Sequence, residues 1–121
     1  MRIRAIASVL AALTLSPPAL AADAAHGKQL YTACLACHGD GQHPATIGPS
    51  LVGVVGRKAG SLEDFRYSPA MTRSDLVWDD RNLHDYILDP QKKVKGNRMP
   101  YGGLGNAADA DDVIAYLHTL K

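Results

Sequence analysis

The pentapeptide Cys34-Leu35-Ala36-Cys37-His38 decides what the rest of this 121-residue chain folds around. Two thiols three residues apart lie on one face of a helical turn, where both can add to the vinyl groups along one side of a porphyrin. The histidine that follows is placed to bind the iron from one axial side. The C-x-x-C-H spacing therefore predicts one covalent c-type haem, attached through Cys34 and Cys37, with His38 as an iron ligand.

Two other uses of this motif fit the chain less well. A thioredoxin-like dithiol needs a βαβ setting, and the sequence shows no alternating strand pattern. A structural zinc site needs four ligands, but the remaining histidines form no second paired motif. They are His26, His43, His84 and His118. The chain has no other cysteines, so a haem that takes both leaves none for a disulfide and must itself supply part of the core.

The first 21 residues have the three parts of a secretory signal peptide. Arg2 and Arg4 precede an apolar run over 5–15, and Ala19-Leu20-Ala21 offers small residues before a cut. The apolar run is too short to span a bilayer. An uncleaved amphipathic anchor is the alternative, against which the small residues argue. We therefore expect cleavage after Ala21, a periplasmic location and a single haem domain over 22–121, with no stable membrane insertion.

Cleavage also sets the size and charge of the mature domain. About 100 residues make one domain that buries only roughly 60 to 65% of its unfolded surface, so a buried haem would add needed core. Loss of Arg2 and Arg4 leaves 11 Lys+Arg against 12 Asp+Glu, a formal charge of −1. This balance does not suggest nucleic-acid binding.

The spacing of apolar residues predicts an all-α domain with long loops. Helices are expected over 24–34 after an Asp23 cap, over 68–73 entered through Ser68 and Pro69, from Asp79 or Asp80 to Pro90 with a further turn through Lys93, and over 108–120. Glycine-rich stretches over 39–60 and 95–106 predict loops, which need something to wrap around.

The second axial ligand is the open question, and Met99 is the favoured candidate. It lies in a loop between Gly96 and Gly102, where the backbone can fold closely over a porphyrin face. Met71 falls in an expected helical turn near Trp78, where packing is the better interpretation. The four other histidines are better read as surface residues, although a His84 ligand would imply a lower-potential site.

Further short stretches follow the motif in a definite order. They are Gly-Lys-Gln-Leu-Tyr at 27–31, Gly-Pro-Ser-Leu-Val-Gly-Val-Val-Gly-Arg at 48–57, Phe-Arg-Tyr-Ser at 65–68, Trp78, Tyr86 before Asp89-Pro90, Met99 before Tyr101, and Asp-Val-Ile-Ala-Tyr-Leu at 112–117. This series resembles the class I cytochromes c, of the soluble mitochondrial and bacterial c2-like kind, over essentially the whole mature chain. The resemblance implies that the first and last helices cross and that long loops wrap around one haem.

The resemblance also implies roles for individual residues. The Pro49 carbonyl would accept the Nδ1 hydrogen of His38. Tyr86 would approach the Met99 sulfur, and Tyr101 would cover the haem edge. Four residues match positions that hold the inner haem propionates: Arg57, Tyr67, Ser68 and Trp78. Another four would let the first and last helices cross closely: Gly27, Tyr31, Val113 and Tyr116.

Two positions depart from the family pattern. Asn97 stands where a threonine hydroxyl often lies beside the outer propionate, and it can still donate a hydrogen bond. Met71 stands near a position where the family commonly has a polar asparagine, and it cannot replace that asparagine in a polar network. We therefore expect a reduction potential that is shifted relative to the family.

Ligation by His38 and Met99 would leave no open iron position, and a methionine ligand raises the potential. The predicted function is therefore a one-electron carrier, not an enzyme, acting as a monomer between respiratory or photosynthetic partners such as a bc1-type complex, a terminal oxidase, a reaction centre or a dehydrogenase. A dedicated electron-accepting dehydrogenase subunit is the alternative, followed by a haem peroxidase or gas-binding protein. Five basic residues are expected to frame the haem edge and favour acidic partners: Lys28, Lys92, Lys93, Lys95 and Arg98.

Overall fold

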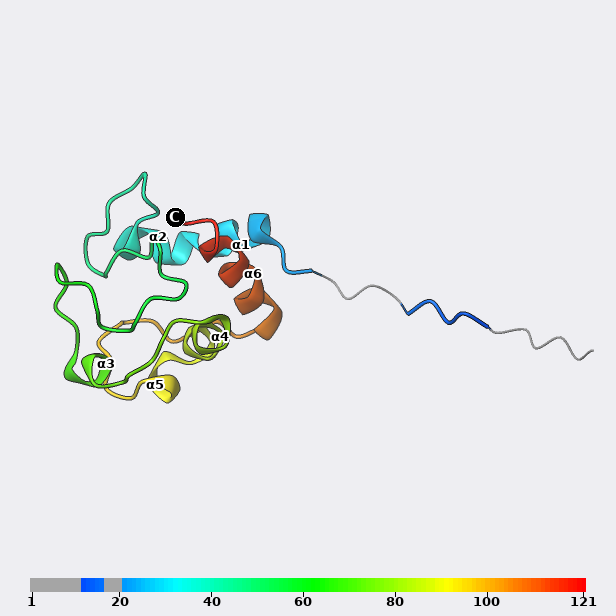
Figure 1. Ribbon diagram of the computed structural model, residues 1–121. Helices are drawn as coiled ribbons and strands as arrows, with labels where there is room; N and C mark the ends of the chain where they lie inside the picture. The colour runs from blue at the N-terminus through cyan, green and yellow to red at the C-terminus, as the bar shows by residue number, and fades with distance from the viewer. Residues whose placement is uncertain (1–11, 17–20) are drawn as a thin grey trace, which may run out of the picture.

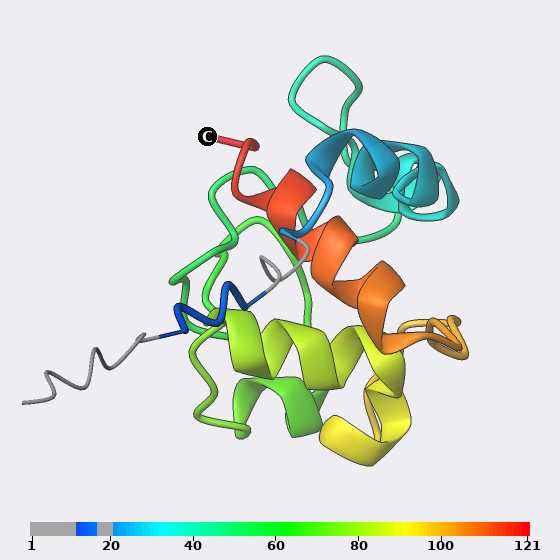
Figure 2. The same cartoon turned by 90° about the vertical axis from the view of Figure 1, so that its right-hand side faces the viewer.

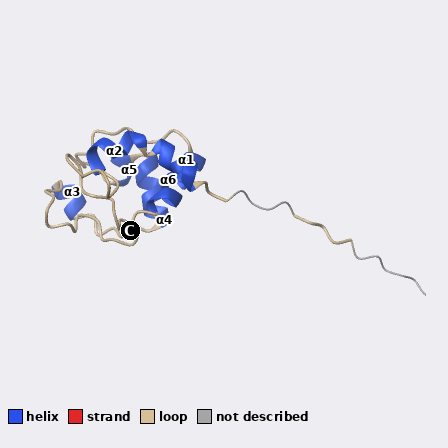
Figure 3. Cartoon of the chain, turned by 90° about the horizontal axis from the view of Figure 1, so that it is seen from above, coloured by secondary structure: helices blue, strands red, loops and turns tan. Residues whose placement is uncertain are grey.

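The computed structural model describes residues 12–16 and 21–121, so most of the expected signal segment lies outside the described residues. Within them the chain forms α1 (Ala24–Leu30), α2 (Thr32–His38), α3 (Pro69–Thr72), α4 (Asp80–Leu88), α5 (Pro90–Lys93) and α6 (Ala107–Leu117) (Figure 1). The described part contains no strand, as Figure 3 shows, and only an isolated bridge between Lys58 and Val77. The predicted all-α class is confirmed. No helix among these residues is long and apolar enough to cross a membrane.

The first predicted helix, over 24–34, is two helices that meet at Tyr31. The Asp23 carboxylate caps α1 by accepting the N–H groups of Ala25 and His26 at 2.9 and 3.1 Å. Tyr31 keeps a right-handed helical conformation, so α2 continues as far as His38, beyond the predicted end. Gly39 then ends α2 with a φ of 62°, a value that favours glycine. The entire haem-attachment motif is therefore helical.

The short helices begin where capping residues predict them. Ser68 Oγ accepts the Met71 N–H at 3.1 Å at the start of α3, and Pro69 occupies its first turn. Asp79 caps α4 by accepting the Asn82 N–H at 2.8 Å. Asp89 and Pro90 then end α4 and open α5, so the expected break and further turn are both confirmed.

The crossing of α1 and α6 depends on a glycine. A β-carbon on Gly27 would lie 1.9 Å from the Asp112 carbonyl oxygen, so no larger residue fits without moving a backbone. Beside it, the rings of Tyr31 and Tyr116 pack with their centroids 5.0 Å apart. Figure 2 shows α1 lying across α6. This crossing was predicted, although α6 starts one residue earlier and stops three residues sooner than expected.

Two groups of helices face each other across the molecule. In Figure 1, α1, α2 and α6 form the upper group, and α3, α4 and α5 form the lower one. The segments between α2 and α3 and between α5 and α6 join the two groups and carry few helical residues, as the glycine-rich sequence predicts. Buried side chains of both groups and of the loops belong to one apolar cluster, among them Val54, Met71, Leu83 and Val113.

Candidate haem-binding site

A cavity of about 490 Å³ lies between the two groups of helices and the loops. That volume is within the range of sites that hold a cofactor-sized ligand. All twelve residues predicted for the haem site line it: Cys34, Cys37, His38, Pro49, Arg57, Tyr67, Ser68, Trp78, Tyr86, Asn97, Met99 and Tyr101. None of the other four histidines lines this cavity, so His84 is no longer a candidate ligand for a haem bound there.

Helix α2 brings the attachment motif to the cavity wall. Cys34 and Cys37 are half-buried free thiols separated by one helical turn, so both can react with one edge of a flat ligand. Gly39 turns the chain away after His38, and its N–H donates to the Leu35 carbonyl at 2.8 Å. Burial raises the pKa of the Cys34 thiol, which is consistent with its apolar surroundings.

His38 is oriented by the loop that follows α2. Its Nδ1 lies 2.7 Å from the Pro49 carbonyl oxygen, so the ring donates from Nδ1 and keeps a lone pair on Nε2 for a metal. Gly48 packs against the ring: a β-carbon there would lie 2.6 Å from His38 Cε1. Burial also lowers the pKa of His38, which favours the neutral imidazole that a metal requires.

The loop carrying Met99 is fixed at both ends. The Met99 N–H donates to Asn97 Oδ1 at 2.9 Å, and the Leu104 N–H donates to the Ile87 carbonyl at 2.9 Å. Gly103, with a φ of 107°, passes so close to α4 that a β-carbon would lie 2.1 Å from the Leu88 carbonyl oxygen. These contacts hold the half-buried Met99 in the cavity wall.

Arg57 provides an unpaired positive charge in the wall of the cavity. Its guanidinium donates to the Ser50 carbonyl at 2.8 Å and to the Val52 carbonyl at 3.4 Å, and no described carboxylate lies within ion-pair distance. Burial lowers the pKa of Arg57. A half-buried cation that meets only neutral acceptors is suited to an anionic ligand group such as a propionate.

Aromatic residues add neutral donors beside Arg57. Trp78 is 7% exposed, and its ring packs 4.9 Å from that of Tyr86. No described residue accepts a hydrogen bond from the Trp78 indole or the Tyr86 phenol. Burial raises the pKa of Tyr86 to about 12, so its hydroxyl stays protonated and able to donate. The Tyr67 hydroxyl accepts the Leu62 N–H at 3.3 Å and keeps its own hydrogen.

The side chain of Asn97 makes other hydrogen bonds than the expected one to a propionate. Its side-chain amide donates both hydrogens to backbone carbonyls, to Pro90 at 3.0 Å and to Val94 at 2.9 Å, while its oxygen accepts the Met99 N–H. This arrangement leaves no amide hydrogen of Asn97 for the expected hydrogen bond to an outer propionate. Asn97 instead braces the Met99 loop. Ser68 also caps α3, but its hydroxyl hydrogen is still available.

The sequence analysis missed several residues of the cavity wall. Gly48 beside His38 has a detectable signal, because it directly precedes the proline whose carbonyl holds that ring. The apolar lining lacks such a signal, since core residues of any fold look alike in sequence. It includes Leu30, Leu51, Val54, Phe65, Leu83 and Ile87.

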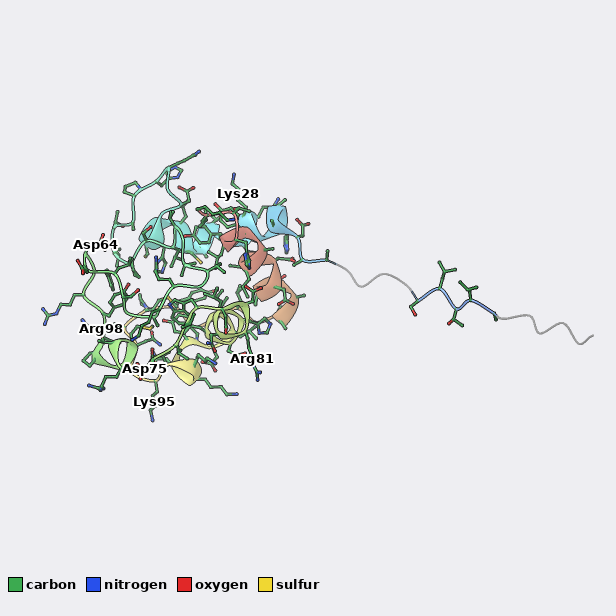
Figure 4. All side chains as sticks on the ribbon, in the orientation of Figure 1. Lys28, Asp64, Asp75, Arg81, Lys95 and Arg98 are labelled. Carbon is green, nitrogen blue, oxygen red and sulfur yellow. The ribbon has the colours of Figure 1, made fainter. Side chains whose placement is uncertain are left out.

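The expected basic frame is only partly present. Arg98 lines the cavity, and its guanidinium donates to the Tyr67 carbonyl at 2.6 Å. Lys93 instead pairs with Asp85 at 3.1 Å. Figure 4 shows Lys28 at the top of the molecule, away from Lys95 and Arg98 at its lower left, and neither Lys28 nor Lys95 lines the cavity. The basic residues therefore do not form one continuous frame, although the charged residues that do line the cavity, Arg57, Arg66 and Arg98, are all cationic.

The groups that line the cavity define the class of protein. An apolar cavity holds two thiols on one helical turn, an oriented neutral imidazole, a methionine and an unpaired cation, which together fit a covalent porphyrin with acidic side chains. The fold and the site are those of a c-type haem protein.

Comparison with known proteins agrees with this assignment to the c-type haem proteins. The model of the cytochrome c family matches residues 24–121. The chain is 45% identical to cytochrome c2 of Rhodoblastus acidophilus, over 84% of this chain and 95% of that protein. It is 44% identical to cytochrome c2 of Rhodomicrobium vannielii, over 94% of this chain and 93% of that protein. Cytochrome cH from Methylobacterium extorquens has a similar structure, with a TM-score of 0.75 and 41% identity, over 80% of this chain and 98% of that one.

The chain belongs to the cytochrome c family. It shares the class I fold, carries one covalent haem c on its C-x-x-C-H motif, and is a monohaem electron carrier.

Proposed function

We propose that this protein is a freely diffusing periplasmic carrier in which His38 and Met99 would both bind the haem iron, so that no position would be left for a substrate. The observation that carries the proposal is that both residues line one cavity, where the Pro49 carbonyl orients the His38 ring and the Asn97 side chain accepts the Met99 N–H. The bound haem supplies an iron that accepts and releases one electron. The protein contributes the two ligands, a dry apolar wall and fixed polar groups.

The polar groups are proposed to hold the haem propionates. Arg57 supplies the cation, and the Tyr67 hydroxyl and Trp78 indole supply neutral donors. Each of these groups has hydrogens that no described residue takes up. Burying a carboxylate without such partners would cost several kcal/mol. Tyr86 donates from a neutral phenol toward the side of the cavity that carries Met99, and Tyr101 covers the edge of the site.

Closed coordination separates a carrier from a peroxidase or a gas-binding protein. The ferric holoprotein should be low-spin and show a sulfur-to-iron charge-transfer band. Met99→Ala should abolish that band, lower the reduction potential and let small ligands bind. Met71→Leu is the matched control, because Met71 also lines the cavity but should leave the band intact. Loss of the band in Met71→Leu alone would reassign the ligand, and a high-spin wild-type iron would exclude the carrier mechanism.

Export and partner choice complete the proposal. Residues 1–21 are proposed to be removed as a signal peptide, which mass spectrometry of the purified holoprotein would test. Respiratory or photosynthetic redox proteins are the proposed partners, as they suit a one-electron carrier related to cytochromes c2.

The rim of the cavity favours a mixed contact surface for such partners. Ile47 lines the cavity and is 69% exposed, and the cationic Arg66 and Arg98 line the same cavity. An apolar contact with modest attraction to acidic groups follows. Arg98→Gln should slow electron transfer to an anionic small-molecule oxidant and weaken its salt dependence. Lys95→Gln also removes one positive charge, but from a residue that does not line the cavity, so it should slow electron transfer less than Arg98→Gln does. Equal rates for the two variants would argue against a contact at the cavity rim.

A further inference from the structure

A second cluster of ligating side chains lies outside the haem cavity, where α1 crosses α6. His26 comes from α1, while Asp109 and Asp112 come from the N-terminal half of α6, three residues apart and therefore on one face of that helix. One ligating atom from each of the three lies within 4.8 Å of the others. None of the three lines the haem cavity.

The cluster is partly assembled by contacts between the two helices. The Asp112 carboxylate accepts the Asp23 N–H at 2.7 Å through one oxygen and lies 2.7 Å from His26 Nδ1 through the other. These contacts fix the direction of the imidazole and of one carboxylate. Asp109 accepts no side-chain hydrogen bond from a described residue, so its carboxylate is available.

Charge around the cluster favours a cation. Asp111 precedes Asp112 in the chain, and the Asp23 N–H contacts Asp112, so two further carboxylates are near the cluster. No described lysine or arginine pairs with Asp109 or Asp112. The only positive group within the cluster is the His26 ring when protonated. The hydrogen bond to Asp112 raises the pKa of His26, with further contributions from the charges of Asp112, Asp109 and Asp23. A proton thus occupies this site at low pH, and a metal ion would have to displace it.

From this geometry we infer that His26, Asp109 and Asp112 form a binding site for a divalent transition metal of the zinc type that joins α1 to α6. One imidazole nitrogen and two carboxylate oxygens are ligands that zinc accepts, with water in the fourth position. Calcium would need six to eight oxygen ligands, which three side chains cannot supply. Because α1 and α6 pack together around Gly27, a metal bound here would stabilise that crossing.

The test is titration of the complete, haem-loaded protein with Zn²⁺ against a chromophoric chelator at pH 7.5, together with thermal melts. We expect one tight site per protein and a rise in melting temperature with Zn²⁺. His26→Gln should weaken binding at least about tenfold, which even ligand-supporting residues achieve in metal sites. His43→Gln is its control, because His43 pairs with Asp40 at 3.0 Å and belongs to no three-residue cluster.

Asp109→Asn and Asp111→Asn separate a defined site from a merely acidic surface. Both remove one carboxylate from the N-terminal half of α6, but only Asp109 belongs to the cluster, whereas Asp111 lies 3.6 Å from His84 Nε2. We expect Asp109→Asn alone to abolish the Zn²⁺-dependent rise in melting temperature. Equal weakening by both variants, or no saturable binding by the wild type, would overturn the inference.

Two features keep this test decisive. The Asp109 carboxylate makes no hydrogen bond or ion pair with a described residue, and Asn has nearly the same shape, so the Asp109→Asn variant remains informative if His26→Gln folds poorly. The haem spectra should be unchanged in every variant, because none of these residues lines the haem cavity.

Discussion

The α1–α6 crossing and the loop-built wall of the haem cavity are stabilised in different ways. At the crossing, Gly27 brings two backbones together and Tyr31 packs on Tyr116, so protein contacts protein. In the cavity wall, Arg57, Trp78 and Tyr86 have polar hydrogens that no described residue accepts. The first region can form from the polypeptide alone, whereas the second is complete only with a bound group. The two regions should therefore respond differently to the same perturbation.

Removing the covalent haem should have the largest effect. A Cys34→Ser, Cys37→Ser variant cannot form the thioether bonds, and a mature domain of this size buries too little surface to fold well without its central group. We expect loss of the cooperative thermal transition, measured by circular dichroism, with only partial helix content left. A cooperative melt near that of the wild type would show that the loops are stable without attached haem.

Crowding the helix crossing should come next. Gly27→Ala places a methyl group against the Asp112 carbonyl and should destabilise the holoprotein by about 3 kcal/mol, the upper part of the range for overpacking. Gly102→Ala is the control, because its β-carbon would meet nothing within 4 Å, and it should change stability by less than about 0.5 kcal/mol. Denaturant unfolding of both variants measures the difference. Equal effects would mean that the close approach is not needed.

Tyr31 connects the two regions, and its hydroxyl should have an intermediate effect. The ring belongs to the crossing, while the buried hydroxyl donates at 2.5 Å to the carbonyl of Gly39, directly after the haem-attachment motif. Tyr31→Phe leaves that carbonyl without its donor and should cost about 1–2 kcal/mol in unfolding free energy.

Tyr116→Phe is the matched control for this measurement. It removes a hydroxyl that donates to no described residue from the other ring of the same pair. A loss as large as that of Tyr31→Phe would assign the effect to ring packing and not to the hydrogen bond.

Protonation of His26 should give the smallest effect. Its folded-state pKa lies above the usual 6.5, mainly because of the hydrogen bond to Asp112, so its stabilising contribution is complete below 6.5 and is lost as pH rises through the raised value. The Asp112 pKa is lowered, first by the Asp23 N–H and then by His26, so its contribution is present above 3.8 and lost in acid. The His26–Asp112 pair is therefore most stabilising between about pH 3.8 and pH 6.5.

The His26→Gln variant tests this pH dependence. The measurement is made with a chelator present, so that metal ions are excluded. The unfolding free energies of the wild type and the variant should then converge as the pH rises from 6 to 8. The difference should also shrink with added salt, since both groups are solvent-accessible. A difference that stays constant with pH would argue against protonation of His26 in the folded state.

Several parts of the molecule could be predicted because local chemistry decides them. Asp23, Ser68 and Asp79 cap helices where a short polar side chain precedes helix-forming residues, and Pro90 divides two helices because it lacks an N–H. The first helix was predicted to end at Cys34, because the apolar periodicity used to place it ends there. The helical chain in fact continues through the haem-attachment motif to His38.

Site residues could be named from ordered motifs, but not the partners of their side chains. Asn97 illustrates the limit: its amide could donate to a propionate or to nearby carbonyls, and only the folded loop puts Pro90 and Val94 in reach of both hydrogens. The basic residues are a second case, since Lys93 was expected to frame the haem edge but pairs with Asp85. Such outcomes depend on competition between several possible partners, which the folded conformation of the segment decides.

The sequence by itself determined the haem chemistry, the helical class and the candidate ligands, because thiol spacing, capping and helical periodicity act over a few residues. Only the tertiary structure decided that Asn97 braces Met99, that the basic frame is divided, and that His26 meets two carboxylates of α6. The physical reason is that hydrogen bonds and ion pairs depend on distances of a few ångströms, and those distances are set only when the loops and helices adopt their folded conformations.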